Sequence, residues 1–311
     1  MKIFKPKFWD TKNITLVAII LYPVALVLQI INLIKVRLII AKKFKVKIIC
    51  VGNIYLGGTG KTPLAIKLVE ILKKINKKSV IIKKFYQNQF DEIELIKKKN
   101  KSIFFSKSRI FAINEAIEKK YDTLILDDGF QDHSIFKDLN IICFNENQLI
   151  GNGLTIPAGP LRQSLRCLKK CHIIIINGKK NINFEKKIKK INNKINIFYS
   201  KYELLNITKF KNKNLFAFAG IGNPSNFFKL IKEKKLKLKK TQEFPDHYNY
   251  SSSELNELTF FAKNNGLHLL TTEKDYLRFK NLKIKNISYL KINLKINKEK
   301  NLIKLIKKYL K

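Results

Sequence analysis

The stretch from Ile48 to Ile66 constrains the fold more than any other part of this sequence. Its apolar start, residues 48–51, predicts a buried strand, and the three glycines that follow predict a tight loop. Lys61 and Thr62 then open a helical pattern. A strand, a glycine-rich loop and Gly-Lys-Thr at a helix start form the phosphate-binding loop of nucleoside triphosphatases. The stretch therefore predicts an α/β fold that binds a nucleotide, with a plain glycine-rich turn as the weaker alternative.

Each part of this loop has a physical role toward phosphate. Glycines let successive backbone N–H groups turn toward phosphate oxygens with no Cβ in the way, and the helix N-terminus adds partial positive charge. The Lys61 ammonium is predicted to reach the β- and γ-phosphates of ATP and the Thr62 hydroxyl to bind Mg²⁺. The strict motif has glycine where this chain has Tyr55. We expect the nucleotide to contact the loop residues Tyr55, Leu56, Gly57, Gly58, Thr59, Gly60, Lys61 and Thr62.

An acidic pair follows a second apolar run. Residues 121–126 predict a strand, and Asp127, Asp128 and Gly129 come directly after it. Alone, Asp-Asp-Gly would indicate only a turn, but downstream of a phosphate loop it predicts carboxylates that position Mg²⁺. We therefore expect Thr62, Asp127 and Asp128 to form the metal site. Alternating strands and helices through this part predict a P-loop NTPase-type parallel sheet with helices on both faces.

The charge of the chain points to an anionic partner. Lys and Arg number 63 against 23 Asp and Glu, a formal charge of +40. Such an excess suits nucleic acid, an anionic bilayer surface or a phosphorylated substrate. Richness in Lys, Ile and Asn, as an AT-rich genome produces, explains part of the charge as solvated lysine. Because aromatic residues do not alternate with basic ones in any RNA-binding signature, we expect no nucleic acid.

The N-terminal part predicts a membrane-associated helix. Residues 14–34 carry no charged side chain, a length that can span a bilayer. Six Lys and Arg residues follow between positions 35 and 47, which predicts that the C-terminal bulk is cytoplasmic. Pro23, Gln29 and Asn32 weaken a spanning helix, so a helix that lies in the interface is nearly as well supported. A buried core helix is the weaker alternative, and we expect no cleaved signal peptide.

The four cysteines do not form a disulfide framework in a chain of this size. Cys50 and Cys143 lie in apolar runs and predict small core residues. Cys167, Cys171 and His172 resemble a metal-ligand cluster, but no second cluster completes a zinc site. The pattern fits a reducing cytoplasm.

Four ranges are expected along the chain: the apolar helix and basic flank at 1–47, a nucleotide-binding core at 48–144, a second, smaller α/β domain at 145–285, and a C-terminal segment at 286–311 that could return to the core. A strand at residues 79–82 is expected to lead into a polar loop that carries Asp91 and Glu92. A Pro- and Gly-rich stretch at residues 157–163 is expected to be a loop near the site.

With these residues in view, the chain resembles the tetraacyldisaccharide 4′-kinase family, the lipid A kinases of Gram-negative bacteria. The resemblance rests on several short motifs in a specific order. Besides the apolar N-terminal helix they are Val51-Gly52-Asn53, Gly57 to Pro63, Asp127-Asp128-Gly129-Phe130-Gln131, Pro157-Ala158-Gly159-Pro160-Leu161-Arg162, Phe244-Pro245-Asp246-His247-Tyr248 and Thr271-Thr272-Glu273-Lys274-Asp275.

The resemblance implies ATP- and Mg²⁺-dependent phosphorylation of the 4′-hydroxyl of a tetraacylated glucosamine disaccharide 1-phosphate, at the cytoplasmic face of the bacterial inner membrane. It also implies that Asp91 and His247 form a dyad that orients the sugar hydroxyl and accepts its proton, a role that a carboxylate-oriented imidazole can fill. From the residues alone, His247 would more often be a loop histidine. We expect Lys61, Asp91 and His247 to be catalytic, and we expect a monomer.

Several positions depart from the family's pattern. A usual Ser-Arg-Gly-Tyr is Lys83-Lys84-Phe85-Tyr86 here, so that Lys84 replaces a substrate-side Arg. Gln163 stands where Glu is usual, His133 is displaced by one position, and Asp91 lacks the following Pro. These departures bear on the acceptor side more than on nucleotide binding.

Two other function classes compete with the lipid kinase. One is a membrane-associated P-loop NTPase that acts as a conformational switch, in which Asp91 and His247 would have no acceptor role. The other is a basic, nucleic-acid-associated ATPase, which would not need residues 14–34. Phosphate transfer to a lipid acceptor separates the kinase from both.

Overall fold

The computed structural model describes residues 5–11, 13–86, 90–100 and 102–311. These residues form two compact units. The larger unit contains Lys5–Phe85, Ser102–Lys201 and Leu294–Lys311. The described residues of the smaller unit lie within Tyr86–Lys101 and Tyr202–Asn293.

These units divide the chain differently from the ranges expected above. No boundary follows residue 144, because residues 145–201 continue the sheet that holds the phosphate loop. The expected core range, 48–144, also loses residues 86–101 to the smaller unit. The C-terminal residues 294–311 do return to the larger unit. Strands and helices continue to alternate across residue 144, so neither composition nor periodicity indicates where one unit ends.

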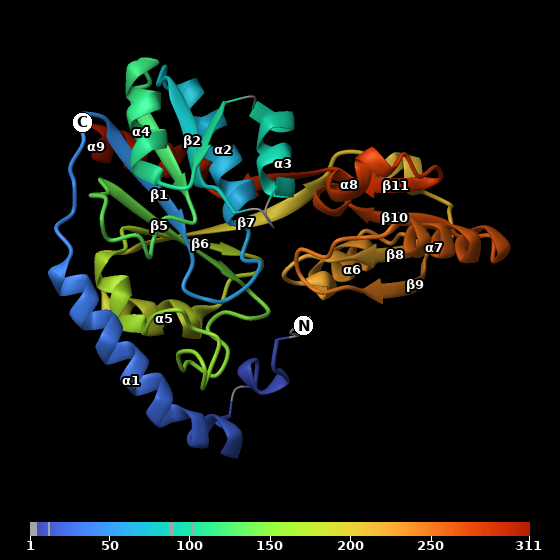
Figure 1. Cartoon of the computed structure of the whole chain (residues 1–311), viewed down its shortest axis with the longest axis horizontal. Helices are drawn as coiled ribbons and strands as arrows, with labels where there is room; N and C mark the ends of the chain where they lie inside the picture. Colours follow the sequence, from blue (N-terminus) through green and yellow to red (C-terminus); the bar gives the residue numbers. More distant parts are fainter. Residues whose placement is uncertain (1–4, 12, 87–89, 101) are drawn as a thin grey trace. The chain divides into compact units, whose positions relative to one another are not determined.

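The larger unit is built on a parallel sheet. Eight strands of the described residues hydrogen-bond in the order β12-β7-β6-β5-β1-β4-β2-β3. Figure 1 labels β1, β2, β5, β6 and β7 of this sheet. The pairings among β1 to β7 are parallel. The bounds are β1 Lys47–Gly52, β2 Ser79–Lys84, β3 Ile103–Ser106, β4 Thr123–Asp127, β5 Leu139–Asn145, β6 Ile173–Asn177, β7 Asn196–Leu204 and β12 Ile292–Ile296.

Helices cover both faces of this sheet, as the alternating pattern predicted. Side chains alternate between the faces of a strand, and Leu126 packs with Ala112 and Ile113 of α4 on one face. The neighbouring Asp127 points to the other face, where it accepts a hydrogen bond from α2. The helix bounds are α2 Lys61–Lys74, α4 Arg109–Glu118, α5 Ile182–Ile191 and α9 Glu299–Leu310, with 3-10 turns η1 Lys7–Trp9 and η3 Leu165–Lys170.

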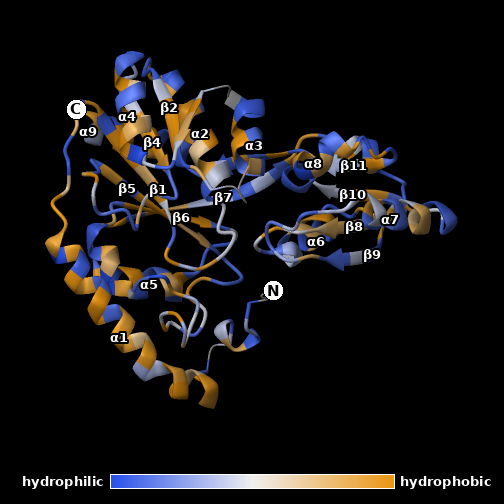
Figure 2. Ribbon diagram, viewed as in Figure 1, coloured by the Kyte–Doolittle hydropathy of each residue, from blue (hydrophilic) through white to orange (hydrophobic). Residues whose placement is uncertain are grey.

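The predicted apolar helix is present as α1 (Leu16–Leu38), and Figure 2 shows it hydrophobic along most of its length. It is long and apolar enough to cross a membrane by length and composition. One narrow stripe faces the larger unit: Ala18 and Ala25 are fully buried, and the Gln29 amide donates a hydrogen bond to the Thr155 hydroxyl at 2.8 Å. Most other side chains of α1 are exposed, and long runs of them are apolar.

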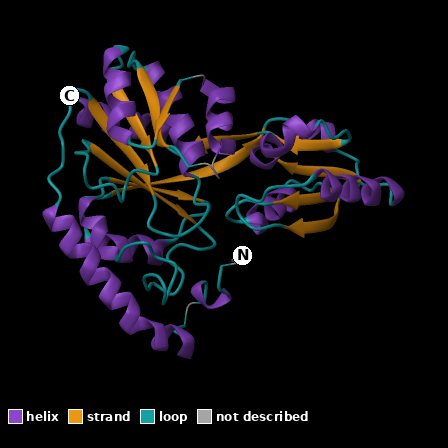
Figure 3. Ribbon diagram, in the orientation of Figure 1, coloured by secondary structure: helices purple, strands orange, loops and turns teal. Residues whose placement is uncertain are grey.

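The smaller unit has its own parallel sheet, in the order β11-β10-β8-β9 among the described residues (Figure 3). One core lies between this sheet and α6, and a second, rich in aromatic rings, lies under α7. A capping box between Ser251 and Glu254 starts α7. The bounds are β8 Leu215–Ala219, β9 Leu238–Glu243, β10 His268–Thr272, β11 Ile287–Leu290, α3 Phe90–Asn100, α6 Pro224–Glu233, α7 Ser252–Asn264 and α8 Glu273–Phe279, with 3-10 turns η4 Ile207–Phe210 and η5 Lys280–Leu282.

The expected polar loop around Asp91 and Glu92 is wrong. Both residues lie in the first turn of α3. Carboxylates in the first turn and lysines in the last turn, as at positions 97–99, stabilise a helix through its macrodipole. Burial also stabilises this helix, because Asp91, Ile93 and Ile96 lie on the inner face of α3.

Candidate active site

The phosphate loop has the backbone that the motif requires. Gly60 caps α2 in the left-handed region with φ 91°, and Gly57 has φ 129°. An L side chain would be strained at either position. Lys61 is the first residue of α2, so the loop delivers the free N–H groups of the helix N-terminus to one point. Such a terminus attracts phosphate.

Tyr55 stands in place of a glycine because its position needs none. Its side chain is fully buried in the core of the larger unit, with Ile54, Phe130 and Leu161. The phenol donates a hydrogen bond to Asp10 and accepts one from Lys5 at 2.9 Å. The Asn53 amide holds the loop by donating to the carbonyl oxygens of Tyr55 at 2.6 Å and Gly57 at 3.1 Å. Tyr55 therefore contributes backbone, not side chain, to the loop.

The metal side of the site brings together Thr62 and Asp127. The Thr62 hydroxyl donates to Oδ2 of Asp127 at 3.0 Å, and the Asp127 side chain has no solvent exposure. The other carboxylate oxygen, Oδ1, is buried and has no hydrogen-bond partner among the described residues. A buried carboxylate oxygen without a donor is costly, and Mg²⁺ prefers oxygen ligands. A hydroxyl and a free carboxylate oxygen beside a phosphate loop therefore fit Mg²⁺.

Asp128 is held by cations. The Arg162 guanidinium donates to both carboxylate oxygens of Asp128, at 3.1 and 3.2 Å, and the Lys61 ammonium lies 3.6 Å from Oδ1. Burial alone would raise the pKa of Asp128, but Lys61 and Arg162 outweigh it and lower that pKa below its usual value. Asp128 also adopts φ 55°, a left-handed backbone that Asp tolerates better than most residues. Its carboxylate stays charged beside the phosphate-binding lysine.

Lys83 is a further cation at this site. It ends the buried part of β2 and pairs in register with Asp127 on β4. Its ammonium lies 3.1 Å from Oδ2 of Asp127, the oxygen that also accepts from Thr62. The motif analysis marked Lys83 only as a departure from the family's pattern. The signal available in the sequence was a lysine at the end of a buried strand.

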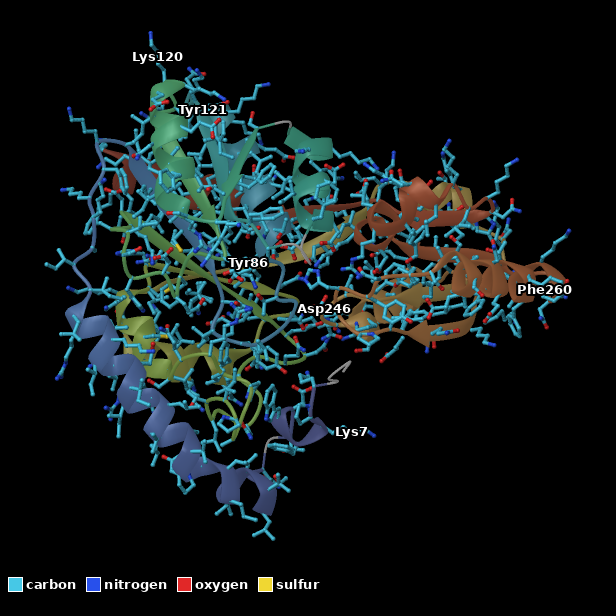
Figure 4. The ribbon with its side chains drawn as sticks, in the orientation of Figure 1. Lys7, Tyr86, Lys120, Tyr121, Asp246 and Phe260 are labelled. Atoms are coloured by element: carbon cyan, nitrogen blue, oxygen red, sulfur yellow. The ribbon has the colours of Figure 1, made fainter. Side chains whose placement is uncertain are left out.

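The smaller unit brings Asp91 and His247 together. Nδ1 of His247 lies 3.4 Å from Oδ1 of Asp91, an ion-pair distance that is long for a hydrogen bond. Asp91 comes from the first turn of α3 and His247 from the loop after β9, which Figure 4 marks at Asp246. His247 has φ 56°, and its N–H donates to the carbonyl of Gly220 at 3.1 Å. A left-handed histidine is a strained conformation of the kind that gathers at functional sites.

Cations fix the Asp91 carboxylate from its other side. Nε of Arg278 donates to Oδ2 of Asp91 at 2.8 Å, and Nη2 lies 2.6 Å from the same oxygen. The Lys274 ammonium is 3.6 Å away. Burial would raise the pKa of Asp91, but Lys274, His247 and Arg278 together lower it to about 2. Asp91 is therefore an anion at every physiological pH and can orient the imidazole.

Arg278 is itself held in place. Its Nη1 donates to Asp275 at 2.7 Å, and the Asp275 carboxylate also accepts from the Gly220 N–H at 3.2 Å and the Thr272 hydroxyl at 2.7 Å. Lys274 and Asp275 belong to a motif that the sequence analysis quoted without a role. Arg278 had no signal beyond its position one turn after that motif.

The structure places the predicted residues in two groups. Gly57 to Thr62, Asp127 and Asp128 gather in the larger unit, where Leu56 is partly exposed and hydrogen-bonded through its N–H to Pro160. Asp91 and His247 gather in the smaller unit. Cys50 and Cys143 are buried in β1 and β5, which confirms them as core residues.

Comparison with known proteins identifies the family. A family model described as tetraacyldisaccharide-1-P 4′-kinase (LpxK) matches residues 17–311. A tetraacyldisaccharide 4′-kinase of Pelagibacter ubique (strain HTCC1062) is 48% identical over 314 residues, which cover 99% of this chain and 98% of the relative. The protein of the same name from Rickettsia canadensis (strain McKiel) is 35% identical, with 96% and 94% covered.

A solved structure agrees over the whole length. The crystal structure titled as the "apo" form of LpxK from Aquifex aeolicus in complex with ATP is 25% identical with a TM-score of 0.73, and the match covers 95% of this chain and 100% of that one. The order of motifs, the phosphate-loop fold and these matches lead to one conclusion: the chain belongs to the tetraacyldisaccharide-1-phosphate 4′-kinase family.

Proposed function

We propose that this chain transfers the γ-phosphoryl group of ATP to the 4′-hydroxyl of a tetraacyldisaccharide 1-phosphate in lipid A biosynthesis, with Asp91 and His247 acting on that hydroxyl. The kinase activity and the use of ATP follow from membership of the family. The single observation that carries the residue roles is the pairing of His247 with a buried, permanently charged Asp91.

The larger unit supplies the phosphate end of the reaction. The N–H groups of residues 57–62 and the Lys61 ammonium hold phosphate oxygens, while Thr62 and Asp127 offer oxygens to Mg²⁺. Bound Mg²⁺ supplies positive charge that the phosphate oxygens need during transfer. Arg162 keeps the Asp128 carboxylate beside Lys61 and fixes its direction. Most of this contribution is placement and charge, which is what phosphoryl transfer requires.

The smaller unit supplies the acceptor end. When substrate binds, Asp91 accepts Nδ1–H of His247, and Nε2 takes the proton of the sugar hydroxyl as the new P–O bond forms. In this structure Nε2 lies 3.9 Å from Glu92 and 3.8 Å from Asp246. The negative charge of Asp91 stabilises the imidazolium that results. Arg278 holds Oδ2 of Asp91, so Oδ1 stays directed at the imidazole. The 3.4 Å separation is long, and such contacts often shorten when substrate binds.

We place the protein at the cytoplasmic face of the bacterial inner membrane, with α1 in the interface rather than across it. Ala18 and Ala25 of α1 are buried against the larger unit, and Gln29 in its middle is hydrogen-bonded to Thr155. A helix that is docked through residues between 18 and 29 leaves its outer, apolar side for lipid. Basic residues 35–47 then adjoin the anionic leaflet and an anionic glycolipid acceptor.

The test is transfer of ³²P from γ-labelled ATP to a detergent-solubilised tetraacyldisaccharide 1-phosphate. We expect a labelled lipid with the wild type, none with Lys61→Ala, and a large loss with His247→Ala while ATP still binds. Lys67→Ala is the matched control, because Lys67 also lies on α2 but pairs with Glu70 and Glu299. ATP hydrolysis without labelled lipid would instead support the switch hypothesis. Unchanged turnover in His247→Ala would refute the role of the pair.

A further inference from the structure

Lys83 is a buried ammonium at the metal side of the phosphate loop. Its side chain is 3% exposed, and that of Asp127 is fully buried. A lysine in such a place must be paired, because an isolated buried charge is costly. One partner is Oδ2 of Asp127 at 3.1 Å, which also accepts from Thr62 at 3.0 Å.

The pair lies in the nucleotide site and not merely in the core. Asp127 is the last residue of β4, and Lys83 is its neighbour in register on β2. Both side chains therefore lie at the carboxyl edge of the parallel sheet, where loops bind ligands. The second oxygen of Asp127, Oδ1, is buried without a partner among the described residues. Lys83 thus occupies one side of a carboxylate whose other side is open to a cation.

Counting the local charges shows what Lys83 changes. At this site Asp127 and Asp128 contact the cationic groups of Lys61, Arg162 and Lys83. Lys83 therefore adds one positive charge directly beside the carboxylate that would hold Mg²⁺. Like charges at short range in a low-dielectric site repel strongly. A divalent cation is therefore disfavoured at Asp127 until an anionic nucleotide reverses the local charge, whereas an anion is favoured at all times.

We propose that Lys83 is a positioning residue that makes metal entry depend on nucleotide. Its ammonium keeps Asp127 in place for Thr62, repels Mg²⁺ from the empty site and adds to the positive field that attracts the triphosphate. The inference rests on the proposed nucleotide site, but its test measures ion and nucleotide binding without phosphate transfer. The inference and the proposed acceptor chemistry can therefore fail separately.

The experiment measures Mn²⁺ binding by electron paramagnetic resonance to the detergent-solubilised full chain, with and without a non-hydrolysable ATP analogue. For Lys83→Met we expect Mn²⁺ to bind at least tenfold more tightly than to the wild type when nucleotide is absent. The metal-free analogue should bind Lys83→Met several-fold more weakly. The gap between Mn²⁺ affinities with and without nucleotide then shrinks.

The two effects have opposite signs, and this separates the proposal from a structural role. Damage to the fold would weaken both kinds of binding. Lys67→Met is the control, because it removes a largely buried, ion-paired lysine from the same unit and should leave both affinities within twofold of the wild type. If Lys83→Met does not fold, Lys83→Gln removes the charge and keeps a donor for Asp127. Folded neutral variants with wild-type Mn²⁺ affinity would overturn the proposal.

Discussion

The phosphate site and the Asp91 cluster arrange cationic groups around carboxylates in different ways. In the larger unit, loop N–H groups and three cationic side chains converge around two carboxylates, and one carboxylate oxygen is left without a donor. In the smaller unit, one carboxylate is surrounded by Arg278, Lys274 and His247. Its Oδ1 also lacks a hydrogen bond among the described residues, but it faces Nδ1 of His247 at 3.4 Å. The free oxygen of the first site is therefore suited to an added cation, whereas that of the second is directed at an imidazole of the same unit.

The difference separates groups that bind a ligand from groups that orient another side chain. A site that must attract an anion and a metal gathers cationic side chains and keeps an oxygen without a donor. A carboxylate that must direct one imidazole is instead fixed by other contacts, and Asp275 in turn fixes the arginine that holds it. Removing a group from the phosphate site should therefore impair the binding and placement of ATP and Mg²⁺. Removing one from the Asp91 cluster should slow only the step in which the sugar hydroxyl loses its proton.

The largest effect is expected at the phosphate loop. Lys61→Ala removes the cation that opens α2 beside Asp128, at 3.6 Å, and should reduce kcat by on the order of 10³-fold. Labelled-phosphate transfer measures the loss, with Lys67→Ala as the control. Retention of a tenth of the activity would mean that Arg162 and Lys83 carry the charge that we assign to Lys61.

A smaller loss of kcat is expected at the imidazole. His247→Ala should lower kcat by about 10²-fold, the usual size of a general-base effect, with little change in ATP affinity. Asp91→Asn should cause a similar loss, and the double variant should be no slower than the worse single one, since the two residues act as a unit. Additive losses would show that the two residues act independently and that the Asp91 carboxylate does more than orient His247.

The next largest effect is expected on the pH dependence of stability, through the charge of Asp91. The pKa of Asp91 is lowered from 3.8 to about 2 in the fold, so its charge contributes stability that is fully present well above pH 3.8 and is lost as pH falls toward 2. The shift corresponds to about 2 kcal/mol. Urea unfolding between pH 5 and 2.5, followed by a probe in the smaller unit, should show this loss in the wild type and not in Asp91→Asn. Equal acid sensitivity in both proteins would contradict the assigned charge network.

The smallest effect is expected at Tyr55. Tyr55→Phe keeps the buried ring and removes the hydroxyl that joins Lys5 and Asp10, at a cost of about 1 kcal/mol in stability. ATP affinity, measured by calorimetry, should stay within twofold of the wild type, because only the backbone of Tyr55 belongs to the loop. A marked loss of affinity would assign its side chain a part in nucleotide binding.

The sequence predicts these two regions unequally. Glycine torsions and a helix start act locally, so Gly57 to Thr62 and the strand before them could be located from a short stretch. Asp91 and His247 are far apart in the chain and were joined only by family resemblance. Arg278, which fixes Asp91, had no pattern of its own. Helix α3 was missed because its first turn contains the polar residues Asp91 and Glu92 and because few of its positions are apolar.

Unit boundaries escaped prediction for a similar reason. After Ser102 the larger unit ends within β7 and resumes within β12, so these two boundaries fall inside regular strands rather than in Pro- or Gly-rich linkers. The Pro- and Gly-rich stretch at residues 157–163 lies instead within the larger unit, beside the phosphate loop. Arg162 at its end reaches Asp128.

The docking of α1 has a consequence for how the protein can be handled. Gln29 of α1 bonds Thr155, residue 155 bridges to Leu161, and Leu161 bridges to Tyr55 at the start of the phosphate loop. Trp9 adds a second link, through the Pro157 carbonyl. A soluble fragment made by deleting residues 1–47 would therefore lose structural supports of its nucleotide site as well as its membrane contact. We expect detergents or lipids that displace α1 from its contacts with Thr155 to weaken ATP binding as well.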